Sequence, residues 1–217
     1  ITGGAGNDTL LGGAGDDMVA ACDGTPVASV AADIVEHGEA LSVPLSRRQQ
    51  GNVLAAVAHV LRLDEDLSPF YETASSDPDL AWVVTGAGRL VRSPTVFEEV
   101  VKTICTTNCT WSATERMVGA LVEHLGEPAA GAKGGPYGRA FPTPAAMADV
   151  DEAFYRDVVR AGYRGAYLRS LSADVAAGAL DLESLGRASR EELPDDDLAA
   201  LLLALPGVGP YAAAHIM

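Results

Sequence analysis

LAALLLALPGVGPYAAAHIM, residues 198–217, predicts an apolar helix, a tight turn and a second helix that begins at Pro210. Proline is favoured at the first position of a helix, where an N–H group would have no partner anyway. Gly207 and Gly209 leave the turn without side chains, so the phosphates of another chain can approach its backbone closely. The N–H groups at the start of the second helix add an anion site. The segment is therefore either a clamp for a phosphate backbone or an αα-corner that needs glycine only to turn.

The residues between 46 and this segment have the periodicity of helices and carry no strand signal. Their start and stop signals are a capping box, a threonine cap before a proline, and two terminating glycines. In chain order these signals are Thr95 with Glu98, Thr143 with Pro144, Gly162, and Gly178. Helices are predicted at 47–63, 64–74, 77–84, within 93–108, and at 111–125, 143–150, 152–162, 163–178 and 194–205. This part of the chain is therefore predicted to be mainly α, a helical bundle with short connections.

The first 23 residues contain two nine-residue units, GGAGNDTLL at 3–11 and GGAGDDMVA at 12–20. Both fit the pattern GGxGxDxUx and resemble the RTX calcium-binding nonapeptide repeat. Asp8 and Asp17, with backbone carbonyls, would supply the oxygen ligands that Ca²⁺ prefers. Because about three stacked repeats are normally needed for stability, a flexible Gly/Asp-rich linker stays an alternative. Residues 24–45 then predict one or two short strands.

Composition narrows the function classes. The formal net charge is −15, which argues against bulk electrostatic capture of nucleic acid, because phosphate neutralisation needs Lys and Arg. No apolar run is long enough to span a membrane, and no signal peptide is visible. The cysteines form no disulfide framework; Cys105 and Cys109 are expected to share a helix face as half-buried thiols rather than to bind zinc.

Two further stretches, FEEVVKTICTTNCTW at 97–111 and AGYRGAYL at 161–168, accompany the hairpin. In this order, the three motifs resemble the helix-hairpin-helix DNA glycosylase superfamily over residues 46–217, most closely its 3-methyladenine glycosylase II and 8-oxoguanine glycosylase branches. The resemblance implies an enzyme of base-excision repair, and with it a cytoplasmic, nucleoid-associated bacterial protein. Such an enzyme flips a damaged base out of the duplex and cleaves its N-glycosidic bond.

The resemblance also assigns residues. Asn108 would enter the gap left by the flipped nucleotide; as an alternative, it caps the helix that ends there. The remaining DNA-binding residues would be Gly207, Val208, Gly209, Pro210 and Tyr211. Backbone carbonyls that would hold a potassium or sodium ion at the hairpin belong to Leu203, Leu205 and Val208. Candidates near the lesion pocket are Trp111, Tyr163 and Arg164, although Trp111 is also a candidate core residue and His215 is expected to be a plain packed or surface histidine.

Two departures from the family bear on catalysis. Bifunctional members carry a catalytic Lys at the position of Tyr211, and a tyrosine cannot form the imine, so a monofunctional, water-using enzyme is implied. In that branch a catalytic Asp stabilises the oxocarbenium charge, and it would lie about twenty residues past Tyr211, beyond Met217. We therefore expect no catalytic residue and little base release from these 217 residues, a fragment in which 24–45 would be the last remnant of an N-terminal β subdomain.

The predicted organisation is a repeat leader at 1–23, a β remnant at 24–45 and a glycosylase domain at 46–217 that is truncated at its carboxyl end. The predicted function is hydrolytic release of a damaged, alkylated purine from duplex DNA by a monomer that needs no catalytic cofactor. Two alternatives remain: a non-catalytic DNA-binding module that uses the hairpin, and a secreted calcium-binding protein supported by the opening repeats alone.

Overall fold

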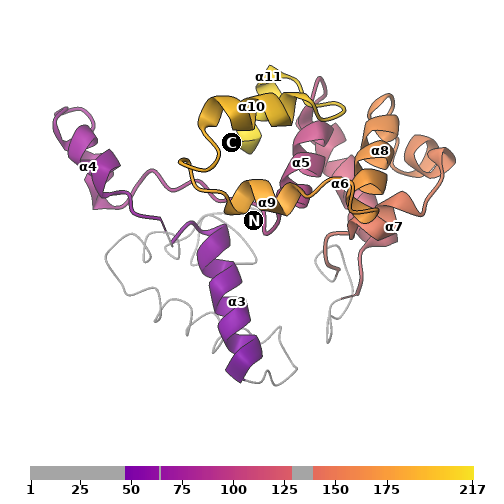
Figure 1. Cartoon of the computed structure of the whole chain (residues 1–217), viewed down its shortest axis with the longest axis horizontal. Helices are drawn as coiled ribbons and strands as arrows, with labels where there is room; N and C mark the ends of the chain where they lie inside the picture. The colour runs from indigo at the N-terminus through magenta and orange to yellow at the C-terminus, as the bar shows by residue number, and fades with distance from the viewer. Residues whose placement is uncertain (1–46, 64, 129–138) are drawn as a thin grey trace. The chain divides into compact units, whose positions relative to one another are not determined.

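The computed structural model describes residues 47–63, 65–128 and 139–217, and these residues are mainly helical (Figure 1). The only β-type pairing among them is an isolated bridge between Pro128 and Arg139. The chain divides into two compact units, one that ends at Arg92 and one that begins at Ser93. The predicted repeats at 3–20 and the predicted strands at 24–45 lie outside the described residues, and the domain boundaries drawn from the sequence stay predictions.

The first unit contains the helices α3 (Arg47–Val60) and α4 (Ser68–Ser75) and the 3-10 helix η1 (Ala81–Thr85). The helix predicted at 47–63 thus ends three residues early, and the segment predicted as a helix at 77–84 forms only the 3-10 turn. Arg89 donates to the carbonyl of Glu65 at 3.2 Å, which ties the segment after η1 to the loop between α3 and α4.

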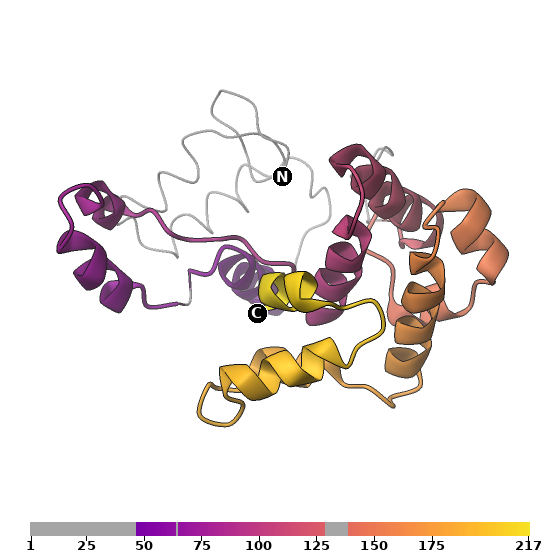
Figure 2. The same cartoon turned by 90° about the horizontal axis from the view of Figure 1, so that it is seen from above.

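The second unit, residues 93–217, carries every predicted DNA-binding residue. Figure 2 shows its helices, coloured from magenta to yellow. Its helical elements are α5 (Val96–Thr106), α6 (Trp111–Leu125), α7 (Pro144–Ala148), the π-type turn η2 (Phe154–Val158), α8 (Arg164–Ala176), α9 (Leu182–Arg187), α10 (Asp195–Leu203) and α11 (Pro210–Ile216). The predicted start of α7 is confirmed: Thr143 accepts a hydrogen bond from the Ala146 N–H at 3.2 Å, and Pro144 is in the first turn of α7. Gly178, with a φ of 72°, follows the end of α8 as predicted, whereas the helix predicted at 152–162 already ends at Val158, and Gly162, with a φ of 60°, lies in the turn before α8.

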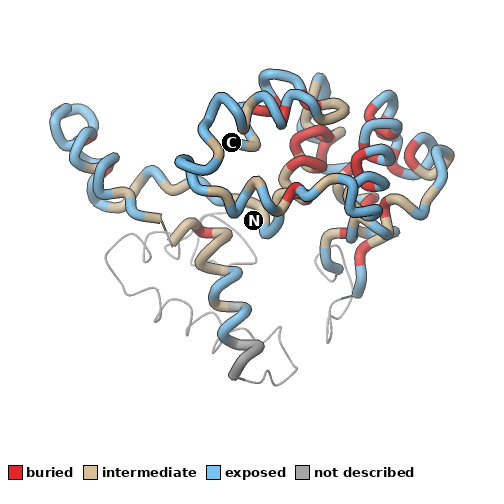
Figure 3. The backbone as a smooth tube through the Cα atoms, viewed as in Figure 1, coloured by how far each residue is buried: buried red, intermediate tan, exposed pale blue. Residues whose placement is uncertain are grey.

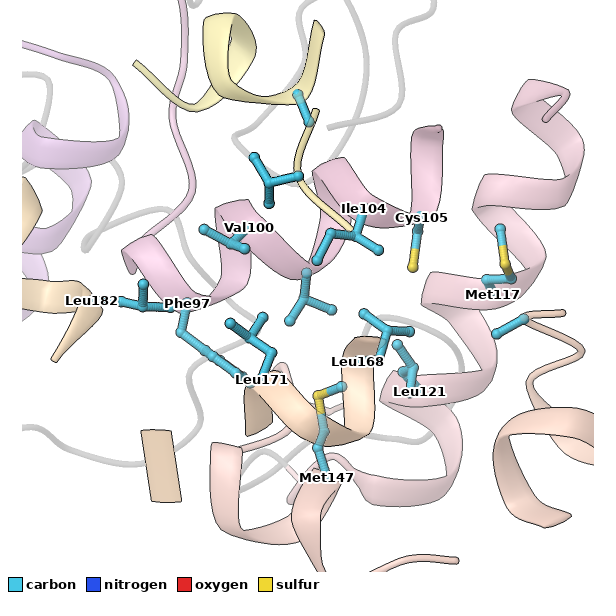
Figure 4. Packing of buried hydrophobic residues seen from close by; sticks show 14 of the residues in the cluster. Phe97, Val100, Ile104, Cys105, Met117, Leu121, Met147, Leu168, Leu171 and Leu182 are labelled. Carbon is cyan, nitrogen blue, oxygen red and sulfur yellow. The ribbon is translucent and has the colours of Figure 1, made fainter. Parts of the chain in front are cut away.

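The core of this unit is built around α5, which packs against α6, α8, α9 and α11. Its apolar stripe is buried at Phe97, Val100, Val101 and Ile104, as the sequence pattern predicts, while Val96 is only partly buried. Red, buried backbone in Figure 3 runs through this helix and the helices around it. Figure 4 shows the side chains that meet it, among them Met117, Leu121, Met147, Leu168, Leu171 and Leu182.

The amino end of α5 is capped in a way that only half follows the predicted capping box. The Thr95 hydroxyl accepts from the Glu98 N–H at 3.2 Å, but the Glu98 carboxylate pairs with Lys102 instead of reaching back. The second cap comes from another helix: the Glu183 carboxylate on α9 accepts from the N–H groups of Val96 at 3.1 Å and Phe97 at 3.0 Å. A negative charge at a helix N-terminus is favourable, so Glu183 both caps α5 and fixes α9 beside it.

The expectation of two half-buried thiols is wrong. Cys105 is fully buried in the core, and burial raises its pKa to about 12. Cys109 is exposed, because α5 ends at Thr106 and the chain turns away before Cys109. The two residues therefore share no helix face, although the Cys109 thiol contacts the Cys105 carbonyl at 3.1 Å.

Candidate functional site

The hairpin predicted from LPGVG is a four-residue turn between α10 and α11. The Val208 N–H donates to the Leu205 carbonyl at 3.2 Å, with proline second and a glycine of φ 81° third, the signature of a type II turn. Val208 is buried in the core, which anchors the turn. Gly209 precedes α11, and its carbonyl accepts the first helical hydrogen bond, from Ala213 at 2.9 Å.

The two hairpin glycines differ in backbone conformation and in the space around them. A Cβ at Gly207 would lie 2.7 Å from a ring carbon of Tyr167, and its φ of 81° is one that other residues rarely adopt. A Cβ at Gly209 would meet nothing within 4 Å, and the backbone there is extended. The fold therefore requires glycine at 207, while at 209 the space beside the backbone is open to a partner.

Asn108 lies just past the end of α5, where Thr107 is the cap residue. Its φ of 46° places it in the left-handed region that a residue after a helix often adopts, so its backbone fits the capping alternative. Its side chain is exposed, however, and the amide nitrogen donates to the Tyr163 hydroxyl at 3.3 Å. The backbone of Asn108 ends the helix, and its side chain remains accessible.

A groove of about 540 Å³ joins the carboxyl end of α5, the start of α8 and the hairpin. It is lined by Thr106, Thr107, Asn108, Tyr163, Tyr167, Gly207, Val208, Gly209, Pro210, Tyr211 and Ala212. All six DNA-binding residues predicted from the sequence are in this set, although Asn108 is separated from the hairpin by about a hundred residues of chain. None of these lining residues carries a formal charge at neutral pH.

Three tyrosines form the aromatic part of the groove. The rings of Tyr163 and Tyr167 meet edge to face at 6.0 Å, and Tyr211 is 60% exposed beside His215, with ring centroids 4.4 Å apart. The hydrogen bond from Asn108 is the main cause that lowers the pKa of Tyr163 below its usual value. His215 is exposed, which agrees with its expected place on the surface.

Sequence reasoning missed Tyr167, which packs on Gly207. The signal that points to it is its spacing: it follows Tyr163, the cap residue of α8, by four residues, so both rings lie on the same side of that helix.

The other two residues predicted near a lesion pocket lie outside this groove lining. Arg164 is 7% exposed and lies behind Tyr163, with its guanidinium over the Tyr163 ring at 4.6 Å. Trp111 is 70% exposed, so its placement in the core is wrong: it is the first residue of α6, and its side chain points to solvent. Its assignment to a lesion pocket stays a prediction.

The carbonyls predicted to hold a cation stay a prediction. Leu203 ends α10, where the last carbonyls lack a helical partner, and the Leu205 carbonyl keeps a lone pair beside its bond from Val208. The described residues contain no cluster of three or more His, Cys, Asp or Glu side chains that could hold a metal ion. Asp8 and Asp17 lie outside the described residues.

None of the helices in the described ranges is both long and apolar enough to cross a membrane.

Comparison with known proteins gives two findings for two parts of the chain. Residues 1–21 match the family model of the RTX calcium-binding nonapeptide repeat (4 copies), which confirms the resemblance of the opening units. No curated protein matches the sequence.

The structure is similar to solved DNA glycosylases. The 8-oxoguanine glycosylase/lyase of Clostridium acetobutylicum, in complex with dsDNA containing cytosine opposite to 8-oxoG, is 25% identical with a TM-score of 0.63, over 80% of this chain and 56% of that one. For the 3-methyladenine DNA glycosylase from Archaeoglobus fulgidus the identity is 18% and the TM-score 0.60, over 80% and 57%. MBOgg1 in complex with a low affinity DNA ligand is 22% identical, with a TM-score of 0.62, and the match covers 79% of this chain and 56% of that one.

This chain thus spans a little over half the length of each of these enzymes. The mainly α class and the helix-hairpin-helix motif predicted from the sequence are confirmed, and the chain has the helix-hairpin-helix fold of these DNA glycosylases.

Proposed function

We propose that this chain binds duplex DNA at a damaged nucleotide turned out of the helix, as the DNA-binding part of a base-excision repair glycosylase. The observation that carries the proposal is the groove in which Asn108 faces the hairpin residues 207–211. A likeness in fold to enzymes solved with DNA supports it.

The hairpin would hold a phosphate through its backbone. Gly209 offers an open approach, and the first N–H groups of α11 have no carbonyl partner within the helix. Backbone donors also answer the difficulty of the net charge of −15, because a phosphate held by N–H groups needs no Lys or Arg in the groove.

Asn108 would occupy the space that the extruded nucleotide leaves in the duplex. Its side chain is exposed at the end of a rigid helix, and its amide can donate to and accept from an unpaired base. The exposed rings of Tyr163 and Tyr211 offer faces on which neighbouring bases or sugars stack, which offsets part of the cost of unstacking the duplex, a few kcal/mol.

A potassium or sodium ion would fit between the hairpin and the phosphate, held by the carbonyls of Leu203, Leu205 and Val208. Such an ion adds a positive charge at the point where the protein supplies none. A test is the affinity for duplex DNA in potassium, sodium and tetramethylammonium salts of equal ionic strength.

The proposed reaction is hydrolysis without a covalent intermediate, on an alkylated purine. Tyr211 lies in the groove, where a phenol cannot form an imine with the sugar. The carboxylate that stabilises the oxocarbenium charge in the resembling family would lie past residue 217. We therefore propose that residues 1–217 bind the lesion and release little base.

The opening repeats support a separate, smaller proposal, calcium binding through Asp8 and Asp17, because residues 1–21 match the repeat family. A calcium titration followed by NMR shifts of residues 1–23 tests it, and unchanged shifts would reject it. We also propose that the protein is located on nucleoid DNA, and this location depends on the main proposal.

The main proposal is tested by the affinity of the chain for a duplex that carries a stable abasic analogue and for the same duplex intact. We expect at least about tenfold tighter binding to the abasic duplex, with Asn108→Ala removing most of that preference. Equal affinities for the two duplexes would reject the proposed function. Base release from alkylated DNA is measured in parallel. Turnover by residues 1–217 would reject the proposal that the catalytic carboxylate lies past residue 217.

A further inference from the structure

Arg164 stands out in the second unit as a buried cation whose partners are all neutral. It is 7% exposed, and none of the ion pairs among the described residues includes it. Burying a charged group costs free energy unless its N–H groups find acceptors. The acceptors of this guanidinium therefore indicate its role.

All three guanidinium nitrogens donate to the protein. Nη2 donates to the Thr107 carbonyl, Nε to the Thr107 hydroxyl at 3.3 Å, and Nη1 to the Ala161 carbonyl at 3.4 Å. The Thr107 carbonyl belongs to the same planar peptide unit as the N–H of Asn108. A donor fixed on that carbonyl therefore restrains the orientation of the peptide plane from which Asn108 enters its left-handed conformation, φ 46°.

The flat face of the same guanidinium holds Tyr163. Its central carbon lies 4.6 Å from the centre of the Tyr163 ring, an arrangement that the ring quadrupole favours. The hydroxyl of that ring accepts the hydrogen bond from the Asn108 side chain. Arg164 thus contacts both ends of the Asn108–Tyr163 pair, the peptide before Asn108 and the ring that bonds its side chain.

We infer that Arg164 is a positioning residue: it presets the turn at Asn108 and the ring of Tyr163 for insertion into the duplex. This role rests on the proposed function. Three of the five guanidinium N–H groups donate within the protein, and two of these three bonds go to Thr107, so Arg164 acts on the duplex through Asn108 and Tyr163. A lysine cannot reproduce the role, because an ammonium lacks the planar fork that reaches Thr107 at two atoms.

The test uses three variants of the full 217-residue chain. Arg164→Met removes the charge and the donors but keeps an apolar stem, and Arg164→Lys keeps the charge alone. Arg169→Met is the matched control, since Arg169 lies on the same helix, is exposed and pairs only loosely with Glu152 at 3.8 Å. Circular dichroism and thermal unfolding first establish which variants are folded, and Arg164→Lys keeps the test available if Arg164→Met unfolds.

The first readout needs no DNA. The side-chain amide resonances of Asn108 in ¹⁵N–¹H spectra report its bond to Tyr163. We expect them to move toward the position of a solvent-exposed asparagine in both Arg164 variants and to stay in place in Arg169→Met. Unchanged Asn108 resonances in a folded Arg164 variant would overturn the inference, whatever the protein does with DNA.

The second readout reports insertion. A duplex carries an abasic analogue with 2-aminopurine opposite, whose fluorescence changes when the stack is disturbed. At saturating protein we expect the Arg164 variants to bind within about threefold of wild-type affinity, because the hairpin is intact, but to lose at least about four-fifths of the fluorescence change. A full fluorescence change with an Arg164 variant would overturn the inference. Failure of the wild-type chain to bind the abasic duplex would instead reject the proposed function, and the insertion role with it.

Discussion

The Asn108 side chain donates a hydrogen bond of 3.3 Å to the Tyr163 hydroxyl, across 55 positions of sequence. The bond joins the carboxyl end of α5 to the residue that precedes α8, and both residues line the groove beside the hairpin. This hydrogen bond positions the side chain of Asn108, the residue proposed to enter the duplex.

The pair predicts a pH effect. Because the Asn108 donor favours the phenolate, Asn108→Ala should raise the pKa of Tyr163 toward its ordinary value of 10.0. A tyrosine whose pKa is lowered on folding gains stability only above its ordinary pKa, so the substitution should change stability through this group near pH 11 and not near pH 7. The ζ-carbon resonance of Tyr163, titrated by NMR, measures the pKa directly.

The control for this titration is Ser170→Ala, an exposed position on α8. It should leave the Tyr163 titration where the wild type has it. A titration that Asn108→Ala does not move would show that the hydrogen bond is absent in solution.

The turn at Gly207 predicts a loss of stability. Gly207→Ala places a Cβ 2.7 Å from the Tyr167 ring at a φ of 81°, so the free energy of unfolding should fall by about 1–3 kcal/mol. Gly119→Ala is the matched control, because Gly119 lies inside α6 with open space around it and alanine is the better helix former by about 0.5–1 kcal/mol. Urea unfolding measures both, and an unchanged free energy in Gly207→Ala would contradict the observed turn.

The cap that α9 provides to α5 predicts a second loss of stability. Glu183→Ala removes the acceptor for the N–H groups of Val96 and Phe97, and should lower the free energy of unfolding by about 1–3 kcal/mol. Glu115→Ala, on the exposed face of α6, should change it by less than about 0.5 kcal/mol. If the two variants unfold at the same urea concentration, the cap contributes nothing in solution.

The thiols should differ sharply in reactivity. In a Cys22→Ser background at pH 8, a disulfide reagent should label Cys109 at once, because that side chain is exposed. Cys105 should react at least about 100-fold more slowly, since its pKa of about 12 and its burial leave almost no accessible thiolate. Adding urea should make both thiols reactive. Two fast thiols in the native protein would contradict the buried position of Cys105.

The elements that could be predicted from the sequence are those with local signals. Thr143 with Pro144 starts α7, Gly178 follows the end of α8, and the glycine of the hairpin has the positive φ that its turn requires. These features depend on residues within one or two turns of each other, so a pattern of neighbouring residues is enough to locate them.

The contacts between distant segments could not be predicted in this way. Nothing in the pattern around Glu183 indicates that its carboxylate caps α5, or that Arg164 is buried against Thr107. The sequence makes Trp111 a candidate for the core or for the lesion pocket, but at the first position of α6 its side chain is exposed to solvent. Burial of a single side chain depends on how helices pack, which the sequence of one helix does not specify.

The most direct measurement of the central claim is the affinity of Gly209→Ala for an abasic duplex, by fluorescence anisotropy. Alanine at 209 meets no protein atom within 4 Å, so the fold should be unaffected, while the new methyl group blocks the approach of a phosphate to the hairpin backbone. We predict binding at least about tenfold weaker than wild type, a loss of about 1.4 kcal/mol, with Gly119→Ala unchanged. Wild-type affinity in a folded Gly209→Ala chain would contradict the claim that this groove binds DNA.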